Sequence, residues 1–188
     1  MTSILKADTI QDTDGNNIIN ENSNTITIGA SGDTTNIIGT LQNNGAAVGG
    51  TMTPAFQAYM SARQTVSTAT NTKINFNTET FDSNANYDTS TYRFTPTVAG
   101  KYFIYASLAS PTATDWDDNT LNIYKNGSIL TSTSSFQTYN SAINTTFIDI
   151  ANGSSDYYEI FYYHNKGSNT EVENAYYRSK FGAYKIIE

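Results

Sequence analysis

Apolar and polar residues alternate along much of the chain, in short runs bounded by turn-forming residues. Lys73–Asn77 alternates strictly, and Lys101–Ala109, Ala142–Ile150 and Tyr157–Tyr163 are apolar-rich runs of strand length. A period of two places successive side chains on opposite faces of a strand. Many short strands separated by turns about every ten residues predict an all-β protein, and a β-sandwich in particular.

The clearest hairpin in the pattern lies at Asn126-Gly127, between the alternating segments Leu121–Lys125 and Ser128–Leu130. Both turn residues tolerate the positive φ of a type I′ turn, whose twist matches that of the flanking strands. A last strand is predicted over Arg178–Ile187. Helix competes with strand only at Ala55–Arg63, where the apolar spacing also fits one amphipathic turn.

Residues 1–50 follow a different pattern, in which isolated isoleucines are separated by clusters of Asn, Asp, Ser and Gly. Ordering a backbone costs about 1–2 kcal/mol per residue, and so few apolar side chains in one chain cannot offset that cost. Either the segment is disordered, or several copies of the chain share their isoleucines along a common axis. The alternating, β-branched Thr25–Ile28 favours the second alternative, an intertwined β-stalk. The residues expected along its axis are Ile26, Ile28, Ile37 and Ile38.

The boundary between the two patterns is a stretch of small residues. Gln42–Thr51 is rich in Gly and Ala, and Pro54 follows it, which is typical of a linker. The predicted organisation is therefore an attachment or stalk segment over residues 1–41, a Gly-rich linker over 42–54 and a head over 55–188.

Composition narrows the class of protein. Aromatic residues make up 13% and charged residues only 14%, so the core must be built from rings and the surface from Asn, Thr and Ser. A formal charge of −7 with scattered basic residues argues against a nucleic-acid partner. The absence of cysteine excludes disulfides and a thiolate zinc site. No run approaches the ~20 apolar residues of a membrane span and the N-terminus shows no secretory signal, so neither membrane insertion nor export is expected.

Residues suited to catalysis are few. His164 is the only histidine, and without a placed nucleophile and carboxylate it is interpreted as a buried or hydrogen-bonded residue at a strand end. The pairs Glu79 with Asp82 and Glu171 with Glu173 show nothing that separates a glycosidase site from ordinary loop acids. The protein is expected not to be an enzyme and to use no cofactor.

An acidic run surrounds the single tryptophan. Asp115, Asp117 and Asp118 supply carboxylate oxygens of the kind that bind Ca²⁺, which makes the run a candidate calcium site. The spacing is not that of an EF-hand, and a solvated loop is the favoured alternative. Trp116 either stacks on a sugar or anchors its loop to the sandwich, and with Tyr139 it marks a candidate ligand-contact loop.

The strand segments of residues 55–188, in their order, resemble the C1q/TNF-like globular domain. The most specific block is Tyr92-Arg93-Phe94-Thr95-Pro96 followed by Ala99-Gly100-Lys101-Tyr102-Phe103. The other segments that carry the likeness are Ala55–Ala58, Ile74–Phe76 with Phe81-Asp82, Asn86–Asp88, Leu121–Leu130, Asp156–Ile160 and Ser179–Tyr184. The resemblance implies a jelly-roll sandwich of about ten strands that forms an obligate homotrimer and binds varied ligands without enzymatic activity.

Outward rings of such domains are expected at the contact between subunits, which gives a reason for the tyrosine excess. The pairs Tyr157-Tyr158, Tyr162-Tyr163 and Tyr176-Tyr177 are expected on strands, with one ring on each face. Three copies are then expected to press these rings together about a shared axis. The candidates for the core or the trimer interface are Phe56, Tyr59, Tyr102, Tyr105, Tyr158, Tyr162, Phe181 and Tyr184.

Residues 1–50 are similar to the N-terminal segments of small tail-fibre or fibre-like virion proteins of marine bacteriophages. The likeness lies in Leu5–Asp12, Asn24–Gly29 and Thr40-Leu41. It implies a virion protein, assembled in the host cytoplasm, that contacts other virion proteins through residues 1–41 and recognises a host-surface polysaccharide or protein with its head. The alternatives are a capsid decoration or head-fibre protein docked by its N-terminus, and a secreted lectin-like binding module.

Overall fold

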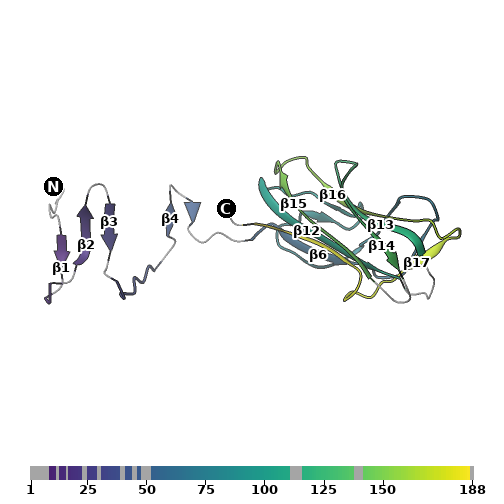
Figure 1. Ribbon diagram of the computed structural model, residues 1–188. Helices are drawn as coiled ribbons and strands as arrows, with labels where there is room; N and C mark the ends of the chain where they lie inside the picture. Colours follow the sequence, from purple (N-terminus) through teal and green to yellow (C-terminus); the bar gives the residue numbers. More distant parts are fainter. Residues whose placement is uncertain are drawn as a thin grey trace. The chain divides into compact units, whose positions relative to one another are not determined.

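The computed structural model describes the chain outside residues 1–8, 12, 16, 23–24, 29–30, 39–40, 44–45, 48–51, 111–115, 138–141 and 187–188. The chain divides into two compact units, Met1–Gly50 and Thr51–Glu188, and each is described by itself (Figure 1). The division falls within the predicted linker of residues 42–54. In the described ranges, no helix has the length and apolar character needed to cross a lipid bilayer.

The first unit contains a three-stranded antiparallel meander of β1 (Thr9–Gln11), β2 (Asn17–Asn22) and β3 (Thr25–Ile28). Its register pairs Ile10 with Ile19 and Ile19 with Ile28, so these three side chains form a row across one face. Ile26 lies two residues from Ile28 on β3 and therefore shares that face. All four isoleucines are exposed in the single chain, Ile26 to 69%.

Two further isoleucines whose side chains the structure describes in this unit are also uncovered. Ile37 and Ile38 are exposed, Ile38 to 96%. Inside the segment predicted to be a linker, β4 (Gln42–Asn43) and β5 (Ala46–Ala47) pair as a short hairpin. The isoleucines predicted to line a stalk are thus exposed in one chain, and their burial in an assembly stays a prediction.

The second unit, the head, is a sandwich of two antiparallel sheets (Figure 1). Its strands are β6 (Ala55–Tyr59), β7 (Gln64–Val66), β8 (Thr72–Lys73), β9 (Thr78–Asp82), β10 (Tyr87–Asp88), β11 (Arg93–Phe94), β12 (Gly100–Ala109), β13 (Trp116–Lys125), β14 (Ser128–Gln137), β15 (Ala142–Ala151), β16 (Tyr158–His164), β17 (Thr170–Val172) and β18 (Lys180–Lys185). The five-stranded sheet has the order β15-β12-β18-β6-β9. The six-stranded sheet has the order β10-β11-β16-β13-β14, with β8 also paired to β16. β7 and β17 form a separate pair.

The predicted hairpin at Asn126-Gly127 is confirmed. Asn126 and Gly127 have φ of 52° and 79°, both positive as a type I′ turn requires, and β13 and β14 pair on either side of them. The side chain of Asn126 reinforces the turn, because its Oδ1 accepts a hydrogen bond from the backbone N–H of Tyr157 at 3.0 Å. The turn is therefore fixed both by its own backbone and by the start of the neighbouring strand β16.

The core between the sheets is built from aromatic rings, as the composition predicts. Phe56 on β6 stacks on Tyr87 and on Phe94, each at a centroid distance of 4.5 Å. The ring of Phe181 on β18 packs edge-on against the Phe56 ring, at a centroid distance of 4.9 Å. The interface or core candidates that are fully buried in the single chain are Phe56, Tyr102, Tyr158, Tyr162 and Phe181. These five therefore take the core alternative, because the two sheets of one subunit close over them without a partner chain.

Two local interpretations are corrected by the structure. The helical alternative at Ala55–Arg63 is wrong, because Ala55–Tyr59 forms β6 and pairs with β9 and β18. Tyr176 and Tyr177 lie in a turn before β18 and not on a strand, so they do not place one ring on each face of a sheet. Sheet pairing decides the backbone conformation at Ala55–Tyr59, and a tight turn decides it at Tyr176-Tyr177.

The alternating run Lys73–Asn77 is a strand only at its start. Lys73 is the last residue of β8, and residues 74–77 lie outside any strand. Ile74 and Phe76 are nevertheless buried, as the alternation predicts. The pattern therefore reports correctly which side chains face the core even where the regular pairing ends.

Candidate functional site

The five-stranded sheet carries apolar side chains on the face that points away from the core. Tyr102 on β12 is buried, so the alternating residues Phe103 and Tyr105 point to the opposite, outer side. The register places Phe103 between Ile148 on β15 and Tyr184 on β18. We call this outer surface the apolar face; its defining residues are Phe81, Phe103, Tyr105, Ile148, Ile150 and Tyr184.

Gly182 leaves room for the ring of Tyr105 over β18, in the middle of the apolar face. The hydroxyl of Tyr105 donates to Gln57 Oε1 at 2.9 Å, so its ring reaches from β12 across β18 to β6. A Cβ at Gly182 would come within 2.4 Å of Tyr105 Cζ. Burial, and then the neighbouring Tyr184, raise the pKa of Tyr105, which keeps the phenol neutral and able to donate. The ring therefore has one fixed position over the strand.

The edges of the apolar face are open to water. Ile148 and Ile150 are 54% and 64% exposed, and Phe81 on the far edge strand is 49% exposed. Contiguous apolar surface of this kind marks a contact with another macromolecule. Because its side chains are hydrocarbon and phenol groups, the apolar face is suited to association and not to catalysis.

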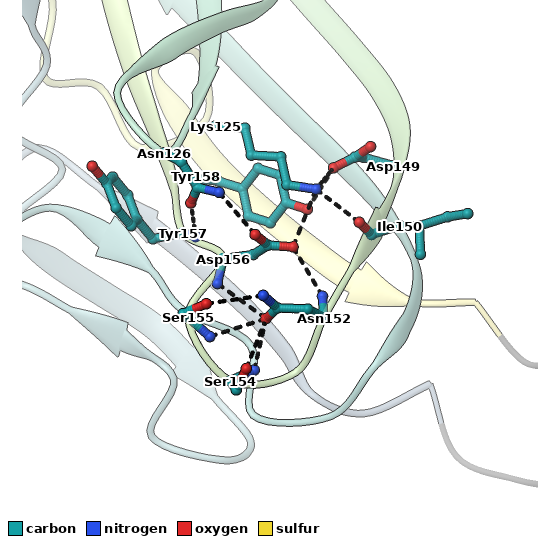
Figure 2. Close-up of polar contacts among 10 residues, drawn as sticks. All are labelled: Lys125, Asn126, Asp149, Ile150, Asn152, Ser154, Ser155, Asp156, Tyr157 and Tyr158. Atoms are coloured by element: carbon teal, nitrogen blue, oxygen red, sulfur yellow. Dashed lines mark hydrogen bonds and ion pairs between the residues drawn. The ribbon is translucent and has the colours of Figure 1, made fainter.

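A charged cluster ties the two sheets together at one end of the sandwich (Figure 2). Lys125 Nζ, at the end of β13, is 2.7 Å from Asp149 Oδ2, 3.2 Å from Asp156 Oδ2 and 2.8 Å from the carbonyl oxygen of Ile150. Tyr158 donates its hydroxyl to the same Asp149 oxygen at 2.7 Å. Since β15 belongs to one sheet and β13 and β16 to the other, these contacts join the two layers.

Lys125 and Asp156 are held in their ionised forms. Burial alone would lower the pKa of Lys125, but its hydrogen bonds to Asp149 and Asp156 outweigh burial and raise the pKa. Burial alone would raise the pKa of Asp156, but hydrogen bonds from Asn126, the Asn152 backbone and Lys125 hold it below its ordinary value. A charged lysine held by carboxylates is neither a general base nor a nucleophile. The charged cluster therefore stabilises the fold.

A second buried charge lies on the outer side of the six-stranded sheet. The Glu159 side chain is 4% exposed and pairs with Lys73 and with Arg93, whose Nε is 2.7 Å from Glu159 Oε1. The Arg93 guanidinium also lies over the Tyr157 ring, 4.1 Å from its centroid. Burial alone would raise the pKa of Glu159, but the hydrogen bonds from the two cations outweigh it and lower the pKa. This carboxylate is therefore committed to structure in the same way.

His164 is confirmed as a buried residue at a strand end. It is the last residue of β16, it is fully buried, and its Nε2 lies 3.3 Å from the carbonyl oxygen of Val66. Burial lowers the pKa of its imidazole, so the neutral form is favoured in the fold. The ring packs in the interior of the head and does not reach a surface where a substrate could meet it.

Three of the four acidic residues considered as a glycosidase site make ordinary contacts, and the fourth, Glu79, is exposed on β9. Glu171 pairs with Arg63 at 3.5 Å and Glu173 pairs with Arg178 at 2.9 Å. Asp82 accepts hydrogen bonds from two backbone N–H groups of the loop that follows it. These carboxylates therefore organise loops of the head.

Part of the predicted ligand and metal chemistry falls outside the described residues. Asp115 and Tyr139 lie there, as do the side chains of Trp116 and Asp117, while Asp118 is exposed. In the part of the chain that the structure describes, no group of three or more His, Asp or Glu side chains is placed to hold a metal ion. The calcium site and the ligand-contact loop stay predictions.

Sequence patterns did not single out Glu159 or Lys125. One signal was present for Glu159, since a lone carboxylate inside an aromatic strand run requires a cationic partner once it is buried. No signal identified that partner, because Lys73 and Arg93 come from other strands. For Lys125, the adjacent Asn126-Gly127 signal predicts the backbone conformation of the turn and carries no information on the contacts of the preceding side chain.

No protein-family model and no curated protein matches the chain. Solved structures do match it. The globular domain of zebrafish complement 1qA protein aligns with a TM-score of 0.53 and 16% identity over 72% of this chain and 98% of that chain. Eiger TNF from S. frugiperda aligns with a TM-score of 0.55 and 9% identity, over 71% and 91%. Murine APRIL aligns with a TM-score of 0.54 and 9% identity, over 70% and 98%. The likeness shows the fold, and the predicted C1q/TNF-like jelly roll is confirmed.

Proposed function

We propose that this protein is a non-enzymatic structural protein of a bacteriophage particle: a homotrimeric, tail-fibre-like protein whose head recognises the host surface. The observation that carries the proposal is the apolar face of the head, which is open to water in one chain. Trimerisation is also supported by the C1q/TNF resemblance of residues 55–188. The virion role is supported by the likeness of residues 1–50 to fibre-like virion proteins.

The apolar face gives the head a physical reason to associate. Fully burying an isoleucine or phenylalanine side chain is worth about 1.5–3 kcal/mol, and Ile148, Ile150 and Phe81 each leave roughly half or more of their surface in water. A closed ring of copies covers such a face on every member equally and leaves no open end. A homotrimer built on this face therefore stabilises the head without forming fibres.

The first unit fits the same symmetry. The row formed by Ile10, Ile19 and Ile28 needs a second apolar surface, and two further copies supply one along a common axis. Head and stalk would then favour the same number of chains. Three linked heads raise avidity by ~10²–10⁴ over one head when they engage together, which suits adsorption through weak individual contacts.

The charged residues of the head support the non-enzymatic part of the proposal. Lys125, Asp156 and Glu159 are held in ion pairs that join strands, and His164 is buried. These are the described groups best suited by chemistry to acid–base or nucleophilic work, and each has a structural task. Recognition through surfaces is the function that remains well supported.

Light scattering on the purified chain is expected to give about 61.8 kDa, three times 20.6 kDa. The head alone, residues 51–188, is expected to remain a folded trimer, because the apolar face lies wholly within that compact unit. Replacing Ile148 and Ile150 together by aspartate (I148D/I150D) puts two carboxylates into the subunit contact. This variant of the head is expected to be a monomer, with its fold checked by circular dichroism.

Ile129→Asp is the matched control for that variant. Ile129 is 56% exposed, but it lies on β14 of the six-stranded sheet, outside the apolar face. The control head is expected to keep the mass of three copies. A monomeric unaltered head, or an I148D/I150D head that stays trimeric, contradicts the proposed assembly.

The virion role is tested by locating the protein in assembled particles. Cryo-electron microscopy of the phage, with gold-labelled antibody against the head, is expected to place the protein at the tail. Density on the capsomers would contradict the tail-fibre role and support capsid decoration. Absence of the protein from purified particles would overturn the virion role altogether.

A further inference from the structure

Three tyrosines gather at the end of the head opposite the point where the chain enters it at Met52–Pro54. Tyr176 and Tyr177, in the turn before β18, are 65% and 67% exposed and meet edge to face at a centroid distance of 5.7 Å. Tyr59, the last residue of β6, meets Tyr176 edge to face at 6.2 Å. We call these three residues the tyrosine platform. Two large rings with two thirds of their surface in water are an unusual exposure for a β-sandwich whose other tyrosines are half-buried or buried in the described ranges.

The turn that carries the tyrosine platform is tied down on both sides. The N–H groups of Arg178 and Ser179 donate to the carbonyl oxygen of Ala175 at 2.9 and 2.8 Å, which closes the turn on itself. The turn is also bonded to β12 and to the residues after β6; the bonds are Glu173 N–H to Ala109 O at 2.8 Å, Ser107 Oγ to Arg178 O at 2.6 Å and Asn174 Nδ2 to Ser61 O at 3.0 Å. Rings on a fixed turn lose little conformational entropy when a ligand settles on them.

Two ion pairs lie beside the tyrosine platform. Arg178 is paired with Glu173 at 2.9 Å, and Arg63 with Glu171 at 3.5 Å. The charges within these two pairs cancel, and Lys180, the register partner of Tyr59 on β18, adds one cation. The uncharged polar groups beside the rings are amides and a hydroxyl from Asn174, Asn77 and Ser61, which hydrogen-bond to one another.

We infer that the tyrosine platform is a binding site for a neutral polysaccharide. A pyranose ring has one face of C–H groups, which packs against an aromatic ring, and an edge of hydroxyls, which exchange hydrogen bonds with amides and hydroxyls. Exposed, rigid rings bordered by uncharged polar groups provide both. This inference rests on the proposed function, since it names the ligand class and the residues of a head that recognises the host surface.

The test is affinity electrophoresis of the full chain through gels that contain one soluble polysaccharide each: dextran, mannan or galactan as neutral probes, and alginate as an anionic probe. The unaltered chain is expected to be retarded by at least one neutral probe. The double variant Tyr176→Ala, Tyr177→Ala is expected to weaken that binding by about tenfold or more, since tyrosines that a ligand covers contribute a large share of binding energy. Tyr163→Ala, on the outer side of the six-stranded sheet, is the control and is expected to bind as the unaltered chain does.

Several outcomes overturn the inference. They are no retardation by any neutral probe, retention of binding by the double variant, and stronger retardation by alginate. Loss of trimeric mass in the double variant would assign the tyrosines to the subunit contact instead. Loss of adsorption to host cells without any polysaccharide binding would assign them to a protein receptor. Each of these leaves the trimeric mass of the unaltered chain and its place in the particle intact, so failure here is distinct from failure of the proposed function.

Discussion

Replacing Phe56 by alanine is expected to lower the free energy of unfolding of the head by about 4 kcal/mol, within the ~3–5 kcal/mol typical of buried Phe→Ala changes. The ring is fully buried and contacts Tyr87, Phe94 and Phe181 at once. Those rings come from different strands of both sheets and hold one another in place, so they cannot collapse easily into the cavity. Since domains are stable by only about 5–15 kcal/mol, the loss is a large share of the total.

The measurement is urea unfolding followed by circular dichroism, at one fixed protein concentration because association couples to stability. Tyr176→Ala is the matched control, as it also removes an aromatic ring but from a side chain that is 65% exposed. Its free energy of unfolding is expected to change by no more than about 0.5 kcal/mol. Equal losses in the two variants would mean that the ring cluster at Phe56 is not the centre of the core.

Local sequence signals predicted the strands of the head well. Asn126-Gly127 dictates a type I′ turn by its tolerance of positive φ, and this single preference fixes the pairing of β13 with β14. The runs Ala142–Ile150 and Tyr157–Tyr163 lie within one residue of β15 and β16 as observed. Such signals succeed because the preference is carried by the residues of the element itself.

Which face of a strand turns inward is not carried by the strand alone. Tyr102 and Phe103 are both aromatic neighbours on β12, yet the first is in the core and the second belongs to the apolar face. The choice depends on the strands that flank β12 and on the sheet that packs beneath it. Period-two reasoning therefore found the rings but could not divide them between the core and the apolar face.

The charged clusters could not be predicted from the sequence, for a related reason. Lys125, Asp149 and Asp156 come from β13, β15 and the turn before β16, and only the folded topology brings them together. The tyrosine platform is similar, because Tyr59 and Tyr176 are far apart in the chain and meet only after β6 and β18 pair. Sites assembled from separate elements in this way require the fold before their residues can be grouped.

Replacing Glu159 by glutamine is expected to lower the free energy of unfolding by about 3 kcal/mol, the lower end of the ~3–5 kcal/mol for removing one partner of a buried ion pair. Glutamine keeps the shape of the side chain but leaves Lys73 and Arg93 without their counter-charge. The loss stays at the lower end because the side chains of Lys73 and Arg93 are 26% and 41% exposed and can be hydrated. Urea unfolding at neutral pH measures this loss in the free energy of unfolding. Glu171→Gln, which removes an exposed partner of Arg63, is the control and is expected to cost about 0–1 kcal/mol.

The pH dependence separates charge from packing at Glu159. Its pKa in the folded head lies below the ordinary value of 4.5, so the unfolded chain takes up this proton more readily than the folded one. The stability that Glu159 contributes is therefore fully present above pH 4.5 and is lost as the pH falls through the lower, folded-state pKa. The unfolding free energies of the unaltered chain and of Glu159→Gln are expected to converge over that acid range, because protonated glutamate resembles glutamine. A difference that stayed constant as the pH fell would mean that the variant loses packing and not an ion pair.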